Sequence, residues 1–132
     1  MIIKYQFFPD DLLYIIKFEG EFSLEKYEES IRFFNMEPNW KYVKKILLDI
    51  RNTMSSNYKV ITKELLRIRN STDFPTYKMA YLVNDPGLLA NLDLYVQRVD
   101  KSGYYEYFST LKAALNHLSI HQPMIEIEKK IG

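Results

Sequence analysis

The sequence lacks cysteine entirely and contains only four glycines among its 132 residues. Without cysteine the chain forms no disulfide, no thiolate nucleophile and no sulfur-rich metal site, which fits a reducing compartment. The glycines lie far apart, so that no glycine-rich loop is present to hold a phosphate group. Nucleotide binding of the usual kinds is therefore not expected, and no cofactor is expected either.

An excess of charge of one sign and long apolar segments are also missing. Eighteen basic residues stand against seventeen acidic residues, which gives a net charge of +1. Binding to nucleic acid or to an anionic membrane normally requires a basic excess, so neither is an expected partner. The apolar runs, such as residues 12–16, are too short for a transmembrane helix or a signal peptide. We expect a cytoplasmic protein.

The chain is rich in apolar residues, which make up 47% of it. This share is enough for a hydrophobic core, and 132 residues is the usual size of one domain. No repeat, linker or low-complexity tract divides the sequence. We therefore predict a single domain over residues 1–132, in which residues 122–132 form an edge strand, an arm exchanged with a neighbouring copy, or a frayed tail.

The spacing of apolar residues predicts an α/β fold. Strands are expected at residues 2–8, 12–18, 44–50, 78–83 and 104–108, with a hairpin joining the first two and Gly20 ending the second. Helices are expected after Ser23, at residues 58–69, at residues 86–99, and after Ser109 or Thr110. The order ββαβαβαβα with right-handed crossovers gives a mixed, mostly parallel sheet with helices packed on it and residues 44–50 at its centre.

Polar residues gather after the predicted strands, at the expected carboxyl edge of the sheet. The candidate binding residues are Asp49, Arg51, Asn52, Ser55, Ser56, Asn84 and Asp85, with Glu19 and Glu21 beside them. One interpretation is that these residues solvate loops and cap helices, with Asp49 paired to Arg51. The other is a recognition surface, at which the amino end of the second helix offers unpaired N–H groups to an anion or to an acidic group of a partner.

Catalytic and metal-binding patterns are weak. His117 and His121 lie four residues apart, but a metal needs further ligands, and we expect both histidines on the solvent side of a helix end. The adjacent acidic residues at 10–11 and 28–29 do not converge across a pocket as acid–base catalysis requires. The aromatic run at residues 104–108 favours packing over the stacking of bases. We therefore expect no catalytic residue and no metal site.

Four segments, at residues 20–23, 46–51, 79–83 and 108–118, carry a family resemblance. They read Gly-Glu-Phe-Ser after the hairpin, Ile-Leu-Leu-Asp-Ile-Arg and Met-Ala-Tyr-Leu-Val in two strands, and Phe-Ser-Thr-Leu-Lys-Ala-Ala-Leu-Asn-His-Leu in the closing segment. In these segments the chain resembles the STAS superfamily, and more narrowly the SpoIIAA-like proteins of bacteria, which are related to anti-sigma-factor antagonists. The resemblance extends to about Leu118 and implies the same fold.

A further part of the resemblance concerns a phosphorylation switch. Classical members of this family carry an Asp-Ser-Ser-Gly turn before the second helix, and a partner kinase phosphorylates its serine to switch binding. The nearest match here is residues 54–57, in which Met54 replaces the acid and Asn57 replaces the glycine. The serine pair remains, so that the resemblance implies phosphorylation of Ser55 or Ser56 and a negative charge at the helix amino end.

Two classes of function remain open at this point. The class favoured by the resemblance is a non-enzymatic protein-binding or regulatory module, which recognises a protein partner through the loop between the third strand and the second helix. The alternative is a small-molecule binding domain for a lipid or a nucleotide, or an unrecognised enzyme. A homodimer is also an expectation, because Tyr104, Tyr105 and the strand-like tail from Met124 can extend the sheet of a neighbouring copy.

Overall fold

The computed structural model of the chain describes residues 1–54, 63, 78–98, 105–120 and 127–129. Its strands are β1 (Ile2–Phe8), β2 (Leu13–Glu21), β3 (Lys45–Met54), β4 (Lys78–Leu82) and β5 (Tyr105–Phe108). Its helices are α1 (Leu24–Met36), α3 (Pro86–Arg98) and α4 (Leu111–His117), with the short 3-10 helices η1 (Pro9–Asp11) and η2 (Trp40–Tyr42). None of the described helices has the length and apolar character that a membrane crossing requires.

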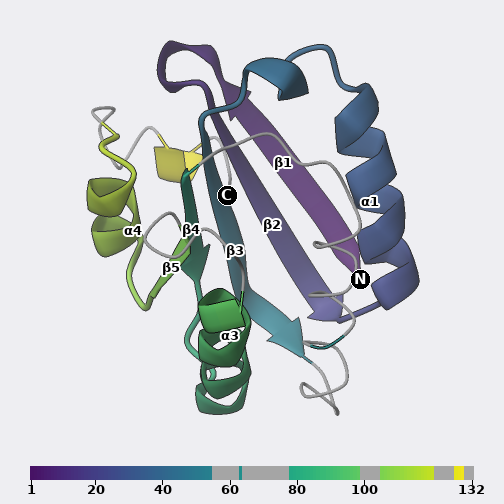
Figure 1. Cartoon of the computed structure of the whole chain (residues 1–132), viewed down its shortest axis with the longest axis vertical. Coiled ribbons are helices and arrows are strands. Elements are labelled where there is room, and N and C mark those ends of the chain that lie inside the picture. Colours follow the sequence, from purple (N-terminus) through teal and green to yellow (C-terminus); the bar gives the residue numbers. More distant parts are fainter. Residues whose placement is uncertain (55–62, 64–77, 99–104, 121–126, 130–132) are drawn as a thin grey trace.

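The five strands form one mixed sheet in the order β1-β2-β3-β4-β5 (Figure 1). Strand β1 runs antiparallel to β2, and the pairs β2–β3, β3–β4 and β4–β5 are parallel. The predicted α/β class, the opening hairpin and the central position of the third strand are therefore confirmed. Because parallel strands end on the same side, the carboxyl ends of β2 to β5 define one edge of the sheet.

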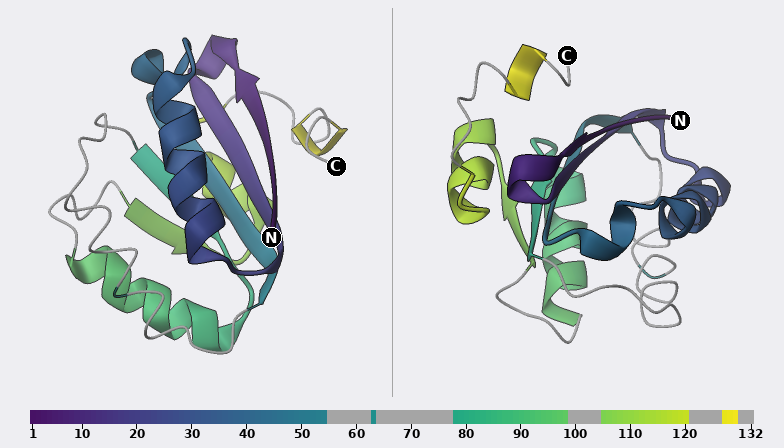
Figure 2. Two further views of the ribbon diagram at one scale, coloured as in Figure 1. Left: turned by 90° about the vertical axis from the view of Figure 1, so that its right-hand side faces the viewer. Right: turned by 90° about the horizontal axis from the view of Figure 1, so that it is seen from above.

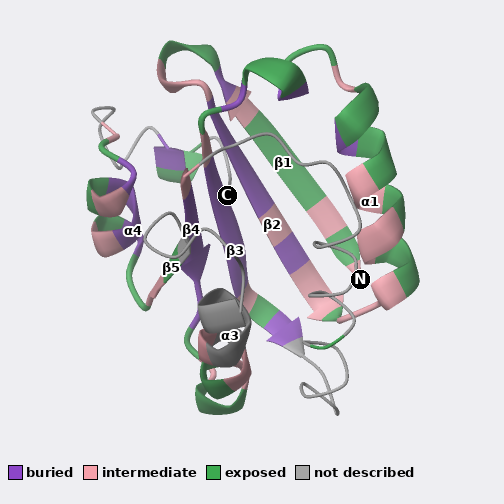
Figure 3. Ribbon diagram, viewed as in Figure 1, coloured by how far each residue is buried: buried purple, intermediate pink, exposed green. Residues whose placement is uncertain are grey.

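Helices cover both faces of this sheet, with α1 and α3 on one face and α4 on the other (Figure 2). The buried side chains of β3 alternate between these faces, as a strand requires. Ile46, Leu48 and Ile50 belong to the core under α1, whereas Leu47 belongs to the core under α4. Figure 3 shows that β2, β3 and β4 are buried along most of their length, while β1 is largely exposed.

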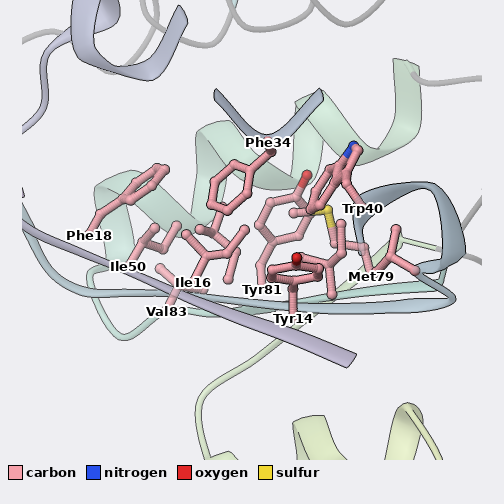
Figure 4. Packing of buried hydrophobic residues seen from close by; sticks show 12 residues of the cluster. Tyr14, Ile16, Phe18, Phe34, Trp40, Ile50, Met79, Tyr81 and Val83 are labelled. Carbon is pink, nitrogen blue, oxygen red and sulfur yellow. The ribbon is translucent and has the colours of Figure 1, made fainter. Parts of the chain in front are cut away.

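The core under α1 combines aromatic rings with aliphatic side chains (Figure 4). Tyr14 lies edge-on to Phe34 and Trp40, with ring centroids 5.8 and 5.2 Å away, and the rings of Phe34 and Trp40 stack at 5.0 Å. Such contacts favour defined ring orientations in addition to burying apolar surface. The rings therefore fix where α1 lies over the sheet, with Phe34 as the one buried residue of that helix.

Three helices begin at the predicted capping residues. The Ser23 hydroxyl accepts a hydrogen bond from the Lys26 N–H at 3.3 Å, and the Thr110 hydroxyl accepts one from the Ala113 N–H at 3.2 Å. The Asp85 carboxylate accepts a hydrogen bond from the N–H of the third residue after it, Leu88, at 2.9 Å. Each cap satisfies an amide that the helix itself leaves unpaired.

The prediction that Gly20 ends the second strand was wrong. Strand β2 continues to Glu21, and Gly20 lies inside it with φ at 90°, paired with Thr53 of β3. Glycine adopts this backbone conformation without the steric penalty that other residues meet. The parallel pairing with β3, which also extends beyond its predicted end to Met54, keeps both strands in the sheet.

The edge strand, one of the three alternatives for residues 122–132, is absent from residues 127–129, the part of that segment that the structure describes. Residues 127–129 are helical, and the side chain of Ile127 is fully buried in the core under α4, beside Leu118. The alternation of apolar and acidic residues suggested a strand. In the described part of this segment, the apolar residue Ile127 instead packs into the core from a helical turn. The predicted helix at residues 58–69 falls almost wholly outside the described residues, as do Ser55, Ser56, Tyr104 and the other residues of the tail.

Candidate functional site

A β-bulge interrupts the pairing of β2 with β3 near the carboxyl ends of both strands. Lys17 pairs with Asp49 and Glu19 pairs with Asn52, so that β3 has one residue more than β2 between these two pairs. An extra residue of this kind leaves backbone groups out of the regular ladder of hydrogen bonds. In the interior such groups need other partners, because an unpaired amide away from water is costly.

Two side chains supply these partners. The Asp49 Oδ1 atom accepts a hydrogen bond from the backbone N–H of Arg51 at 3.1 Å, and the Thr53 hydroxyl donates to the carbonyl oxygen of Phe18 at 3.1 Å. Asp49 and Thr53 are the two buried polar residues of the part of the chain that the structure describes. Both therefore satisfy backbone groups at the bulge.

The Asp49 carboxylate also binds the side chain of Arg51. The Arg51 Nε–H donates to Oδ1 at 3.1 Å, and Nη2 donates to Oδ2 at 2.9 Å, which makes a bidentate ion pair. The Asp49 side chain is 1% exposed, whereas the Arg51 side chain is 35% exposed. A buried carboxylate requires such a partner, and the pair in turn holds the guanidinium at the surface in one orientation.

The electrostatic surroundings keep Arg51 charged. The hydrogen bond with Asp49 is the main cause that raises the pKa of Arg51 above its ordinary value, and partial burial opposes it. The negative charges of Asp49 and of Glu128, in the helical turn at residues 127–129, raise the pKa further. Arg51 is thus a permanent cation that two acidic groups face.

The other predicted site residues divide between this edge and structural roles. Asn52 is exposed on β3, and Asn84 is exposed directly after β4. The register pairs Asp49 with Leu82, so that Arg51 and Asn84 each come two residues beyond that pair, at the same edge. Asp85 is half-buried and caps α3. Ser55 and Ser56 lie outside the described residues, so their position relative to Arg51 stays a prediction.

The pairing of Asp49 with Arg51, which the sequence suggested as one interpretation, is confirmed. The role of Thr53 was missed, and so was the approach of Glu128 to Arg51. A threonine inside a strand and a glutamate in a charged tail carry no local signal of either the hydrogen bond or the electrostatic interaction. The role of Thr53 depends on which residues of β2 lie beside it, and the role of Glu128 depends on where the carboxyl-terminal segment packs. Both are long-range features of the fold.

The prediction that His117 faces solvent was wrong. Its ring packs on Phe108 with centroids 5.2 Å apart, and Nε2 is buried without a hydrogen-bond partner among the described residues. Burial is the main cause that lowers the pKa of His117, followed by the positive charge of Lys78, while Glu106 and the backbone of Met79 act in the opposite direction. The described residues contain no group of three metal-ligating side chains. His121 is not among them.

Comparison of the sequence with protein-family models and with curated proteins finds no match.

The Asp49–Arg51 pair predicts an asymmetric response to substitution. Arg51→Ala should lower the free energy of unfolding by about 3 kcal/mol or more, because it leaves a buried carboxylate without its cation. Asp49→Ala should cost less, about 1–3 kcal/mol, because the half-exposed guanidinium gains water and the main loss is the partner of the bulge amide. Urea denaturation measures both values, with the exposed Lys112→Ala as control. A larger loss for Asp49→Ala would contradict the assignment.

Protonation of His117 should weaken the fold below pH 6.5. Because its pKa is lowered in the folded state, the unfolded chain takes up the proton first as the pH falls. The ordinary pKa of histidine is 6.5. The free energy of unfolding should therefore decrease as the pH falls from 6.5 to the folded-state pKa of His117. Above pH 6.5 the stabilisation by neutral His117 should be fully present. Chemical denaturation of the wild-type and His117→Gln chains across this range tests the idea. An unchanged pH dependence in the variant would refute it.

Proposed function

We propose that the chain is a non-enzymatic, STAS-like regulatory module that binds a protein partner at the carboxyl end of β3. The observation that carries this proposal is the fixed arginine at that edge, since Asp49 uses both of its oxygens to orient a guanidinium that remains 35% exposed. An oriented arginine loses little conformational freedom on binding and favours planar acidic groups. The partner would offer a carboxylate or a phosphate group.

The neighbouring exposed amides support this choice of surface. Asn52 follows Arg51 on β3, Asn84 comes directly after β4, and each offers both a donor and an acceptor. One cation with two amides at the same end of the sheet has the hydrogen-bonding capacity to recognise an acidic side chain and the backbone beside it. Asp49 contributes by holding Arg51 and makes no direct contact with the partner, because it is buried.

The serine pair supplies the proposed regulation. Ser55 and Ser56 follow β3 directly, only four and five residues after Arg51 in the chain. A phosphate on either serine would add nearly two negative charges close to the proposed binding edge. That phosphate would compete with the acidic group of the partner for Arg51, so phosphorylation would release the partner.

Affinity capture with matched variants tests the docking surface. The amount of partner protein that the wild-type chain retains should fall at least tenfold with the double variant Asp49→Asn/Arg51→Gln. This variant removes the cation without leaving a buried charge. Such a loss is about 1.4 kcal/mol, close to the lower end of the range of about 1.5–3 kcal/mol for one hydrogen bond to a charged group. Ser56→Glu should have the same effect, and the exposed Asn116→Asp on α4 should have none.

Circular dichroism and thermal unfolding of each variant establish that it is folded before capture. The proposal fails if every retained protein binds the double variant as strongly as the wild-type chain, or if Asn116→Asp lowers retention equally.

A second candidate function is the binding of a small molecule, and a cavity favours it. A cavity of about 60 Å³ lies between α1 and the sheet, lined by aromatic rings such as Phe18 and Tyr27 and by aliphatic side chains. Its lining suits a small apolar molecule better than a nucleotide, because apolar cavities of this kind stay dry and accept apolar guests.

Thermal unfolding in the presence of small aromatic and aliphatic compounds tests this second function. A compound present at a hundred times its dissociation constant should add about 2.7 kcal/mol to the free energy of unfolding. Ile31→Phe, which adds volume at the cavity wall on α1, should abolish the gain. Nucleotides serve as the control class, and a gain with nucleotides alone would contradict an apolar site.

A further inference from the structure

Strand β1 is an edge strand of the sheet that the structure describes. It pairs with β2 on one side, and no strand of the described part of the chain pairs with its other side. Natural proteins usually protect such an edge with proline, a bulge or several charges. Strand β1 has no proline, no bulge in its register with β2 and one charged residue, Lys4, whose ammonium group lies 3.5 Å from Glu19 of β2. Among the described strands, none therefore occupies this edge, where a further strand can add to the sheet.

An apolar patch lies beside this edge. Of the six large apolar residues that are exposed in the described part of the chain, three lie on the α1 side, namely Tyr5, Phe33 and Met36, whereas Ile2 of β1 points to the other face of the sheet. The rings of Tyr5 and Phe33 are 5.4 Å apart, which links the strand to the helix. Between β1 and α1 lies a groove of about 280 Å³. Clustered exposure of this kind marks an interaction surface rather than ordinary surface scatter.

We propose that β1 pairs antiparallel with β1 of a second copy of this chain, about a two-fold axis through Tyr5. The two five-stranded sheets would then join into one sheet of ten strands. A symmetric interface of this type closes on itself, so the β1 edge of each copy is paired in a dimer. The inference is independent of the proposed docking function, because it concerns the edge strand β1, whereas the docking site lies at the carboxyl end of the central strand β3.

The sequence of β1 is self-complementary in that register. Tyr5 is the midpoint of the seven residues of β1, so an axis through it pairs the whole strand. Ile2 then lies opposite Phe8 of the second copy, Ile3 opposite Phe7, Lys4 opposite Gln6, and Tyr5 opposite its own equivalent. Moving the axis to Lys4 would place two lysines opposite each other, which is unfavourable. The register that pairs the whole strand therefore contains no like-charge pair.

The position of α1 and the low net charge of the chain also favour a second copy of this chain as the partner at β1. A two-fold axis perpendicular to the joint sheet keeps both α1 helices on one face, so that Phe33 and Met36 of each copy lie near the junction. These residues are 44% and 83% exposed in the single chain. A net charge of +1 gives two copies little mutual repulsion.

Sedimentation of the full chain over a wide range of protein concentration tests the proposal. The expected mass is twice 15.8 kDa. Tyr5→Glu, which would place two carboxylates on the axis, should give a monomer. Tyr42→Glu changes another exposed aromatic residue, 55% exposed and outside both β1 and α1, and should leave the dimer unchanged. A wild-type chain that stays monomeric at every concentration would overturn the proposal.

Substitutions at the exposed Gln6 test the register without removing apolar contacts. Gln6→Glu would face Lys4 of the second copy and should tighten the dimer by at least about twofold, because two opposite-charge pairs form across the axis. Gln6→Lys would place like charges opposite each other and should weaken it by at least about twofold. A dimer that responds to neither charge at position 6 nor to Tyr5→Glu is held elsewhere, for instance by the tail from Met124, and would refute the inference.

Discussion

The β-bulge at Ile50 and Arg51 is the constraint on which the rest of the site depends. It places one extra residue in the central strand, and the sheet tolerates this because Asp49 and Thr53 take the backbone hydrogen bonds that the ladder loses. A buried carboxylate is acceptable there only with a cation beside it. The same requirement that stabilises the bulge therefore places an arginine at the edge of the sheet and fixes its orientation.

The two faces of the sheet give the protein its other surfaces. Aromatic rings under α1 fill the space between helix and sheet incompletely, which leaves the small cavity, whereas α4 and Ile127 close the opposite face with aliphatic side chains. The sheet order places β1 at one edge and the fixed arginine at the carboxyl end of the central strand. Self-association through β1 and partner binding at Arg51 can thus occur together in one molecule.

The sequence was informative where structure follows from neighbouring residues. Caps at Ser23, Asp85 and Thr110 were predicted correctly, because a polar side chain acts on amides only a few residues away. The central strand was also predicted, since a continuous apolar run indicates burial on both faces. The prediction for Gly20 was wrong because a glycine can end a strand but can also adopt a positive φ inside a paired strand, as it does here.

The bulge and its two polar partners were beyond sequence reasoning. An Asp-Ile-Arg segment indicates that two charges share one face of a strand, which made a pair between Asp49 and Arg51 foreseeable. It does not indicate that the strand gains a residue relative to its neighbour, because that depends on the register between segments 30 residues apart in the chain, Lys17–Glu19 and Asp49–Asn52. For the same reason the burial of His117 against Phe108 was not foreseen.

Hydrogen exchange at the backbone amide of Arg51 tests the central claim most directly. If Asp49 holds this amide, it should exchange slowly in the wild-type chain and much faster after Asp49→Ala, relative to the amide of Leu47 in the same strand. An Arg51 amide that exchanges equally fast in both chains would show that the carboxylate does not satisfy the bulge, and would contradict the account of how the arginine is fixed.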